Sequence, residues 1–508
     1  MIEFISRAAL SRYALIDGYE IPNIIFTVDF KPDNSVPFDK NNGKVIIFSE
    51  EIDLPDIREL QEIELEDKAI IKEKIAILPG LSTLEKKPKE LIKKILKTRE
   101  EIGYRRILYA PNIARPMLLP VLHYLGIDIL DDIKCQLGNC SPEELFTIEK
   151  YVKDSIRKKN LRVLVESMPD PLSKTLLRLS DTYFYSQMET FYPVTGNFLN
   201  ASHFESLFRP DIQRWIKRIT DLYEKPEGER YALLLPCSAT KPYSKSRSHR
   251  FYKSIIEKSG KHVHEVIVTS PLGIVPRELE FTFPAKNYDV PVTGYWFEDE
   301  KKMLIESLEK FISRNRYEKI IAYLPEDLSF LEKYLEKMGA SYIIGNLHDE
   351  NNIKKLLEEL KKLDHTKVSK NQLLLDSINS IAMFQFGEKF PLNGKNAKRR
   401  FDEIFVYEKS EQYLYFSPLN GNLLLYRESA KHLLNNGKHV IEIDDFIPKG
   451  SVFVAGIIDA SQDIREGDEV VIHHKGKLIG TGTALMSFKD MLEQERGEAV
   501  KVRHTFIS

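Results

Sequence analysis

Short apolar runs alternate with stretches of helical periodicity along most of the chain. In residues 1–225, apolar runs at 21–30, 44–48 and 75–78 precede a helix-like stretch at 90–101. Short apolar runs between turn residues predict strands, whereas apolar residues about 3.6 positions apart predict helices. The alternation of the two is typical of α/β topology, so we predict a multidomain α/β protein.

A second α/β region follows a charged segment at 220–230, which contains Pro226 and Gly228 and predicts a linker. The apolar run 231–235 predicts a buried strand, and the loop 236–249 separates it from a helical pattern. Further strands are predicted at 265–269 and 319–324, and helices at 301–313 and 327–338. We therefore expect an α/β/α domain over residues 226–366, with a second linker at its end.

The rest of the chain predicts two smaller units. Residues 367–437 combine a helical pattern with strand-like runs, and Asn420-Gly421 is a strong hairpin signal between the last two runs. They predict a small α+β domain. Residues 438–508 are short apolar runs separated by glycines and turns, which predict a small β-barrel.

Composition changes this picture little. A chain of 508 residues exceeds what one core usually serves, so several domains are expected. No apolar stretch is long enough to cross a bilayer, and the first residues lack the pattern of a secretory signal, so we expect a cytoplasmic protein without a membrane role. The net charge of −2 gives no sign of polyanion binding, so any nucleic-acid surface must be local.

The three cysteines stand at positions 135, 140 and 237. Such sparse use is typical of a reducing compartment, and we expect no structural disulfide. Cys135 and Cys140 have His123 as a conceivable third zinc ligand, but no fourth ligand lies near in the sequence. We therefore predict two buried thiols there and no metal.

Cys237 differs because it follows a predicted buried strand. In α/β sheets, ligands bind at the carboxyl ends of parallel strands. A helix N-terminus, the lysine at 241 or a protonated histidine at 249 would lower the pKa of a thiol placed there. The residues alone leave two interpretations open: a reactive thiol, or a small buried side chain without chemistry.

The segment 236–249 resembles the signature of the archaeosine synthases, P-C-x-x-x-K-P-Y-x-x-S-x-x-H. Every fixed position of that pattern matches, namely Pro236, Cys237, Lys241, Pro242, Tyr243, Ser246 and His249. Residues 269–273, 275–280 and 288–296 also resemble this family, and residues 438–508 are similar to an RNA-binding PUA domain. The likeness covers most of the chain and is weakest in its first third.

Within that first third, residues 104–132 resemble part of the (β/α)₈ core of the tRNA-guanine transglycosylases. The segment is shorter than the roughly 250 residues of a complete barrel, so we expect a reduced or altered barrel over residues 1–225. Asp131 falls where the transglycosylases carry a nucleophilic aspartate, although the residues after it depart from their pattern. The alternative for Asp131 is a helix-capping or solvated carboxylate.

The archaeosine synthase resemblance implies chemistry on tRNA. These enzymes convert the nitrile of 7-cyano-7-deazaguanine, in the D-loop, into an amidine. It implies that Cys237 attacks the nitrile carbon to give a thioimidate, that Lys241 or His249 protonates the nitrogen, and that Asp289 holds an amino group. It further implies substrate contacts from Tyr243, Ser246 and Tyr288, with Trp296 as another candidate for stacking on the base.

For partners, the resemblance implies tRNA and an amine donor. That donor is lysine where a radical SAM enzyme later completes archaeosine, or an amino group from glutamine or ammonia. No cofactor is expected, and a homodimer is expected because related enzymes are often dimers. Phosphate contacts are expected from basic residues of the PUA-like region: Lys449, Arg465, Lys475, Lys477, Lys501 and Arg503. Two other functions stay open: a base-exchanging transglycosylase that uses Asp131, and a noncatalytic tRNA-binding subunit.

Overall fold

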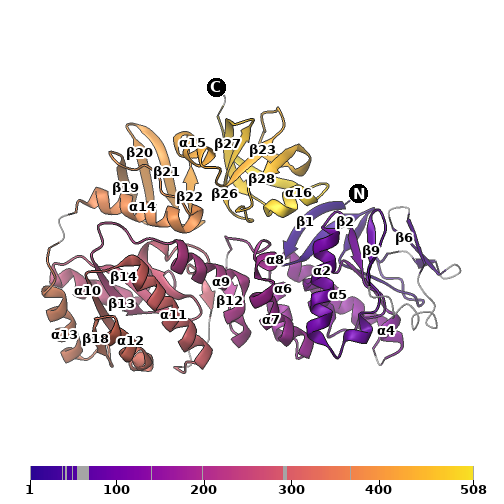
Figure 1. Ribbon diagram of the computed structural model, residues 1–508, viewed down its shortest axis with the longest axis horizontal. Helices are drawn as coiled ribbons and strands as arrows, with labels where there is room; N and C mark the ends of the chain where they lie inside the picture. Colours follow the sequence, from indigo (N-terminus) through magenta and orange to yellow (C-terminus); the bar gives the residue numbers. More distant parts are fainter. Residues whose placement is uncertain are drawn as a thin grey trace.

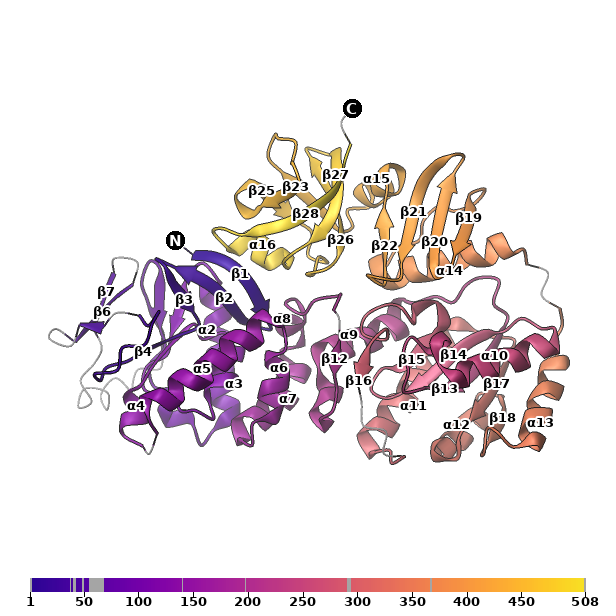
Figure 2. The ribbon, with the colours of Figure 1, turned by 180° about the vertical axis from the view of Figure 1, so that it is seen from behind.

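The computed structural model describes residues 2–36, 38–39, 43–47, 50–53, 68–138, 140–196, 198–289, 294–365 and 368–506. The N-terminal elements and the α/β elements around β13 lie side by side in one row (Figure 1). Of the two C-terminal units, the one with β19–β22 lies above the α/β elements, and the one with β23–β28 lies above the junction between the two halves of the row (Figure 2). The mixed α/β, multidomain organisation is as predicted, whereas the limits at residues 225, 366 and 437 remain predictions.

The N-terminal part begins with an antiparallel sheet of β1 (Ile2–Ala8), β2 (Ser11–Ile16) and β3 (Tyr19–Ile21). A second sheet has the order β4 (Asn23–Ile25), β11 (Ile129–Asp131), β10 (Ile107–Tyr109), β9 (Ile75–Ile77) and β8 (Ile70–Ile71). Its order ends at β4 and β8 within the described residues, so the expected barrel is not confirmed. Five short strands are fewer than the eight parallel strands of a complete (β/α)₈ barrel.

Helices and one small antiparallel sheet complete this part. The sheet consists of β5 (Phe38–Asp39), β6 (Lys44–Ile47) and β7 (Glu50–Asp53). The helices are α2 (Pro88–Ile102), α3 (Leu119–Tyr124), α4 (Ile133–Gln136), α5 (Pro142–Arg157), α6 (Leu161–Ser167), α7 (Pro171–Tyr183) and α8 (Tyr185–Glu189). The apolar faces of α2, α3, α5 and α6 form one buried core with the second sheet.

The α/β domain is built on a five-stranded sheet with the order β15 (Gly273–Pro276), β14 (His264–Thr269), β13 (Tyr231–Pro236), β17 (Lys319–Leu324) and β18 (Ser341–Ile344). All neighbours are parallel except the edge strand β15. Side chains alternate along β13, so Leu233 and Leu235 pack with α10 (Arg247–Ser259) and α13 (Glu350–Lys361). Ala232 and Leu234 belong to the core on the opposite face, which includes α11 (Glu298–Asn315) and α12 (Glu332–Lys337).

Shorter elements connect these units. They are β12 (Leu199–Asn200), η2 (Phe204–Phe208), α9 (Pro210–Lys217), η3 (Arg218–Leu222), η4 (Tyr243–Lys245), η5 (Arg277–Leu279), β16 (Tyr288–Asp289) and η6 (Glu326–Leu331). β12 and β16 pair in parallel with Asn200 opposite Asp289, and this pairing joins the two halves of the lower row.

The third unit is an antiparallel meander of β19 (Asn396–Arg400), β20 (Glu403–Glu408), β21 (Glu411–Ser417) and β22 (Asn422–Leu425) with α14 (Lys370–Phe386) and α15 (Arg427–Asn435). The predicted hairpin at Asn420-Gly421 is confirmed, since β21 and β22 pair across it. Gly421 has φ of 71° and lies against the backbone of Phe281, so a side chain there would clash with the α/β domain.

The last unit is a curled six-stranded sheet of β24 (Ser451–Phe453), β28 (Glu498–Thr505), β27 (Lys477–Ala484), β26 (Glu469–His474), β23 (Val440–Ile443) and β25 (Ile457–Ala460), with α16 (Phe488–Glu493). Val452, Val470, Ile472 and Val500 form its core. Arg7 and Asp490 join this unit to the N-terminal part through a buried ion pair.

The prediction that Cys135 and Cys140 are free thiols is wrong. Cys135 and Cys140 form a disulfide, with their Cα atoms 5.2 Å apart, because the chain turns back just after α4. His123, the conceivable zinc ligand, is buried, and its Nδ1 bonds the Ile127 carbonyl. Within the described ranges, no group of three or more His, Cys, Asp or Glu side chains is arranged to hold a metal ion. None of the helices in those ranges is long and apolar enough to cross a membrane.

Candidate active site

Cys237 directly follows β13 at the point where the strand order of the sheet reverses. The chain passes from β13 to β14 on one side and later to β17 on the other. In open α/β sheets such a reversal leaves a crevice at the carboxyl ends of the two central strands. Asp327 follows β17 at the same edge, and its negative charge acts on the Cys237 thiol. The thiol and this carboxylate therefore flank the place where the fold favours ligand binding.

Three hydroxyl groups lie beneath the thiol. The Tyr288 hydroxyl is 2.6 Å from the Tyr243 hydroxyl and 2.6 Å from Oγ1 of Thr269, the last residue of β14. Thr269 also hydrogen-bonds the Cys237 side chain. The loop after β13, the end of β14 and the short strand β16 thus converge on one hydrogen-bonded network.

The environment of Cys237 favours the protonated thiol. The residue is exposed to solvent on one side, but protein encloses the thiol on the others. This burial raises the pKa of the Cys237 thiol, whereas the Thr269 hydrogen bond and the positive charge of Lys241 lower it. The thiol therefore needs a base at the moment of attack.

Lys241 is the candidate for this base. Its Nζ lies 3.8 Å from the centre of the Tyr288 ring, which holds the ammonium over an aromatic face. Burial lowers the pKa of Lys241, while the neighbouring Cys237 and Asp289 raise it. The lowered pKa of the lysine and the raised pKa of the thiol reduce the difference between the two groups, which favours proton exchange between them.

His249 has a different environment from the one that the sequence suggested. It is 2% exposed, and its Nδ1 accepts a hydrogen bond from Arg277, at 2.8 Å. Burial and the Arg277 charge lower the pKa of His249 to about 3. The imidazole is therefore neutral at physiological pH, with its proton on Nε2, and does not supply the positive charge expected beside Cys237.

The three predicted substrate-binding residues have structural contacts instead. Tyr243 is fully buried, and Tyr288 is 3% exposed. Ser246 is the N-cap of α10, where its hydroxyl accepts a hydrogen bond from the His249 backbone N–H. The polar atoms of all three residues bond other protein groups, so they support the conformation of the loop, and their contact with substrate stays a prediction.

Asp289 is exposed at the carboxyl end of β16, and Trp296 donates its indole N–H to Asp327 at 3.3 Å. Thr269 and Asp327 were not predicted as site residues. The signal for both was available, since each lies at or just after the end of a predicted strand of the same sheet. Residues 290–293, which belong to one of the family-like stretches, lie outside the described residues.

Asp131 is completely buried in the N-terminal part. It accepts hydrogen bonds from the Tyr109 hydroxyl at 2.8 Å and from the backbone N–H groups of Asn112 and Ile133 at 3.1 Å. Burial raises the pKa of Asp131 to about 6. These contacts favour a role for Asp131 in holding the backbone around β11, because a nucleophile would have to be accessible to the nucleobase of the substrate.

The six basic residues predicted to bind phosphate fall into two groups. Arg465 pairs with Glu189 at 2.8 Å, and Arg503 pairs with the buried Glu469, so a phosphate would have to compete with a carboxylate at these two positions. The other four are exposed and remain candidates: Lys449, Lys475, Lys477 and Lys501.

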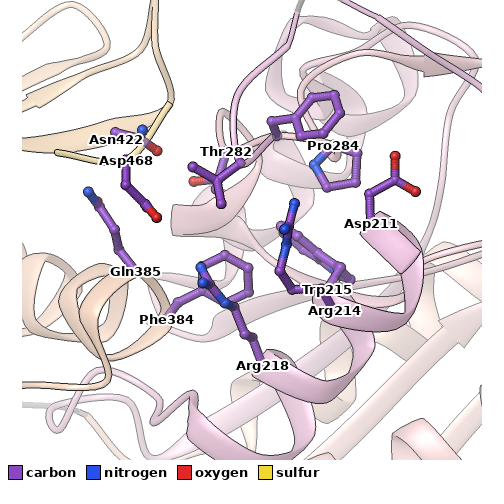
Figure 3. Close-up of a pocket in the computed structure, with 12 residues that line it drawn as sticks. Asp211, Arg214, Trp215, Arg218, Thr282, Pro284, Phe384, Gln385, Asn422 and Asp468 are labelled. Atoms are coloured by element: carbon purple, nitrogen blue, oxygen red, sulfur yellow. The ribbon is translucent and has the colours of Figure 1, made fainter. Parts of the chain in front are cut away.

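The α/β domain and the units above it enclose a small cavity and a much larger cleft. The cavity in Figure 3 lies where α9, α14 and the C-terminal unit meet, with Arg218, Gln385 and Asp468 around it. Its volume of about 20 Å³ suits a water molecule and excludes a base. A cleft of about 810 Å³ between the α/β domain and the third unit reaches His249 and Arg277.

Comparison with known proteins identifies the family. Residues 212–363 match a family described as Domain of unknown function (DUF5591), and residues 439–506 match the PUA domain. The chain is 33% identical to archaeosine synthase subunit alpha of Thermoplasma acidophilum, over 87% of this chain and 90% of that protein. The chain belongs to the archaeosine synthase family.

Other members and relatives agree with this assignment. The archaeosine synthase of Methanocaldococcus jannaschii is 30% identical over 97% of this chain and 89% of its own length. A tRNA-guanine(15) transglycosylase of Methanothermobacter thermautotrophicus is 26% identical over 59% of this chain and 43% of its own. The resemblance seen in segment 236–249 is thus confirmed at the level of the family, and the C-terminal unit is a PUA domain.

Proposed function

We propose that this protein is a tRNA-modifying transferase of archaeosine biosynthesis, which converts the nitrile of 7-cyano-7-deazaguanine in tRNA into an amidine. The observation that carries the proposal is the position of Cys237 at the reversal of strand order, beside Lys241 and Thr269, in a member of the archaeosine synthase family. A thiol supplies the nucleophile that a weakly electrophilic nitrile carbon requires.

In the first step, Sγ of Cys237 bonds the nitrile carbon as one carbon–nitrogen π bond breaks. Lys241, in its neutral form, takes the thiol proton and gives it to the nitrile nitrogen, which leaves a neutral thioimidate. The matched pKa directions of the two groups support this transfer. We assign the proton transfer to Lys241 rather than His249, because the imidazole is buried and held by Arg277.

In the second step, an amine attacks the thioimidate carbon and the carbon–sulfur bond breaks. The Cys237 sulfur leaves as the thiol after receiving a proton from the amine, again through Lys241. No oxidant or reductant is consumed. Asp289 is exposed next to Lys241, and its carboxylate suits an incoming ammonium or the amino group of the base.

The decisive assay is mass spectrometry of nitrile-bearing tRNA after incubation with the full chain and one amine at a time. Lysine, glutamine and ammonia are the three arms, each tested alone. Addition of lysine increases the tRNA mass by that of lysine, whereas transfer of an amino group from glutamine or ammonia increases it by that of ammonia. A lysine product would require a later carbon–nitrogen cleavage, which fits a radical SAM partner. No mass change with any donor would refute the proposal. Release of free base would instead favour base exchange, which the burial of Asp131 disfavours.

A further inference from the structure

A continuous interdomain groove runs from the PUA domain to the edge of the α/β domain. It consists of two adjoining cavities of about 630 and 800 Å³, which share Arg7, Lys159 and Glu466 in their walls. The smaller cavity includes Phe453 and Arg496 of the PUA domain, and the larger one reaches Asn200. α6, α8 and β12 lie in this region, beneath the PUA domain and between the two lower domains (Figure 2).

The groove is basic, although the whole chain is not. Its walls contain the exposed cations Arg157, Lys158, Lys159 and Arg496, whereas Arg7, Arg162 and Arg209 are buried in ion pairs and the chain has a net charge of −2. Arg157 and Lys158, at the end of α5, are 45% and 65% exposed, and Arg496 is exposed without a side-chain partner among the described residues.

The ion pairs along the groove do not prevent phosphate binding. Lys158 pairs with Asp154 at 2.7 Å on the protein surface, and Lys159 pairs with Glu466. Exposed pairs of this kind contribute little to stability and are screened by salt. A phosphodiester can therefore replace the carboxylate as partner at small cost.

Each of the two cavities contains one exposed phenylalanine ring. Phe453 is 58% exposed in the smaller cavity, and Phe198 is 53% exposed in the larger one. Cations that follow a backbone, together with rings on which bases stack, form the usual surface for single-stranded nucleic acid. Duplex recognition would not require the two rings.

One end of the groove lies next to Asp289, and the other end lies next to exposed lysines of the PUA domain. At one end, Asn200 is opposite Asp289 in the pairing of β12 with β16, so the groove ends about one strand spacing, roughly 5 Å, from the backbone of Asp289, whose charge acts on Lys241. At the other end, Phe453 belongs to β24, and Ser451 of the same strand is opposite Lys501. The exposed Lys449 precedes this strand.

We propose that this groove binds a single-stranded RNA segment and guides it from the PUA domain to the Cys237 loop. The inference rests on the proposed function for the identity of the RNA, which is the loop that carries the nitrile base. In this arrangement Arg157, Lys158 and Arg496 contact phosphates, and Phe198 and Phe453 stack on bases.

Anisotropy with a fluorescent tRNA transcript tests the phosphate contacts in the full chain. Lys158→Ala and Arg496→Ala each raise the dissociation constant about 3- to 10-fold and reduce the salt slope by about 0.7. Lys302→Ala is the matched control, because Lys302 is a similarly exposed helical lysine paired with Glu306 four residues away, and it leaves both values unchanged. An unchanged dissociation constant and slope in the Lys158→Ala/Arg496→Ala double variant would overturn the proposal.

Phe198→Ala tests the commitment to a single strand, with Phe401→Ala as control because Phe401 is 86% exposed on the third unit. Phe198→Ala weakens binding of a single-stranded oligonucleotide and leaves binding of a blunt RNA duplex unchanged. Equal weakening of both would overturn the proposal that the groove binds a single strand.

The reaction of Cys237 with the free nitrile base distinguishes an effect on RNA binding in the groove from an effect on the chemical step. Groove variants retain this reaction at the wild-type rate, and loss of it in Lys158→Ala would contradict a role limited to RNA binding.

Discussion

The most deeply buried ion pair between the PUA domain and the N-terminal part joins Arg7 and Asp490. Arg7 donates from Nε to Asp490 at 3.0 Å and from a terminal nitrogen to the Leu10 carbonyl at 3.0 Å. Its guanidinium lies 4.0 Å from the Tyr104 ring centre and 4.2 Å from that of Phe191. The Arg7 and Asp490 side chains are only 3% and 1% exposed, so neither charge can be hydrated if the other is removed.

Arg7→Met tests this pair, since methionine keeps an apolar stem against the two rings while Asp490 loses its partner. Breaking a buried pair costs about 3–5 kcal/mol, which lowers the melting temperature by about 6–20 °C in a unit of 150–250 residues and by less in the larger unit formed by the N-terminal part and the PUA domain. Lys489→Ala removes a half-exposed pair with Glu493 at 3.9 Å in the same helix and costs about 0–1 kcal/mol.

Differential scanning calorimetry of the full chain provides the measurement, because separate transitions are expected from several domains. The transition that contains the N-terminal part and the PUA domain moves in Arg7→Met. In the double variant Arg7→Met/Asp490→Asn, stability is partly restored because no unpaired charge remains buried. A shift in Arg7→Met no larger than that of Lys489→Ala would refute the reasoning.

Three further predictions concern individual groups. Lys241→Met lowers the single-turnover rate of amidine formation about 10²- to 10⁴-fold without changing tRNA affinity, whereas His249→Asn stays within about tenfold; the reverse order would return the proton transfer to His249. Asp131→Asn leaves turnover within about threefold, because its polar contacts serve the fold; a larger loss of turnover with an unchanged melting temperature would assign it to the chemistry. Burial lowers the pKa of His264, but Glu278, 3.0 Å away, outweighs this and raises it, so the pair's stabilisation is complete below about pH 6.5 and is lost as pH rises through the raised pKa. Urea unfolding at pH 6 and pH 9 checks this, and His264→Gln abolishes that part of the difference.

The local pattern around Cys237 could be predicted from the sequence because it depends on neighbouring residues. The apolar run 231–235 became β13, and the thiol follows it at the sheet edge. The role of Ser246 as a helix N-cap could also have been predicted, since serine before a helical pattern is a common start signal. The hairpin at Asn420-Gly421 belongs to the same class of local signals.

The parts that could not be predicted depend on distant partners. His249 is neutral because burial and the charge of Arg277, which lies 28 residues later and donates to the ring, both lower its pKa. Arg465 is occupied by Glu189, 276 residues earlier, and no pattern near Arg465 indicates this. The disulfide was missed because the frequency of cysteine indicates a redox compartment and does not indicate whether one turn brings two thiols together.

Intact-protein mass spectrometry tests the covalent role of Cys237 most directly. The full chain is incubated with the nitrile base 7-cyano-7-deazaguanine in the absence of any amine, and the adduct is located by peptide mapping. The account predicts a mass increase equal to that of the base on the peptide that contains Cys237, and no increase in Cys237→Ser. Cys237→Ala should also form no amidine on tRNA while binding tRNA normally. Amidine formation at the wild-type rate by Cys237→Ala would contradict the account.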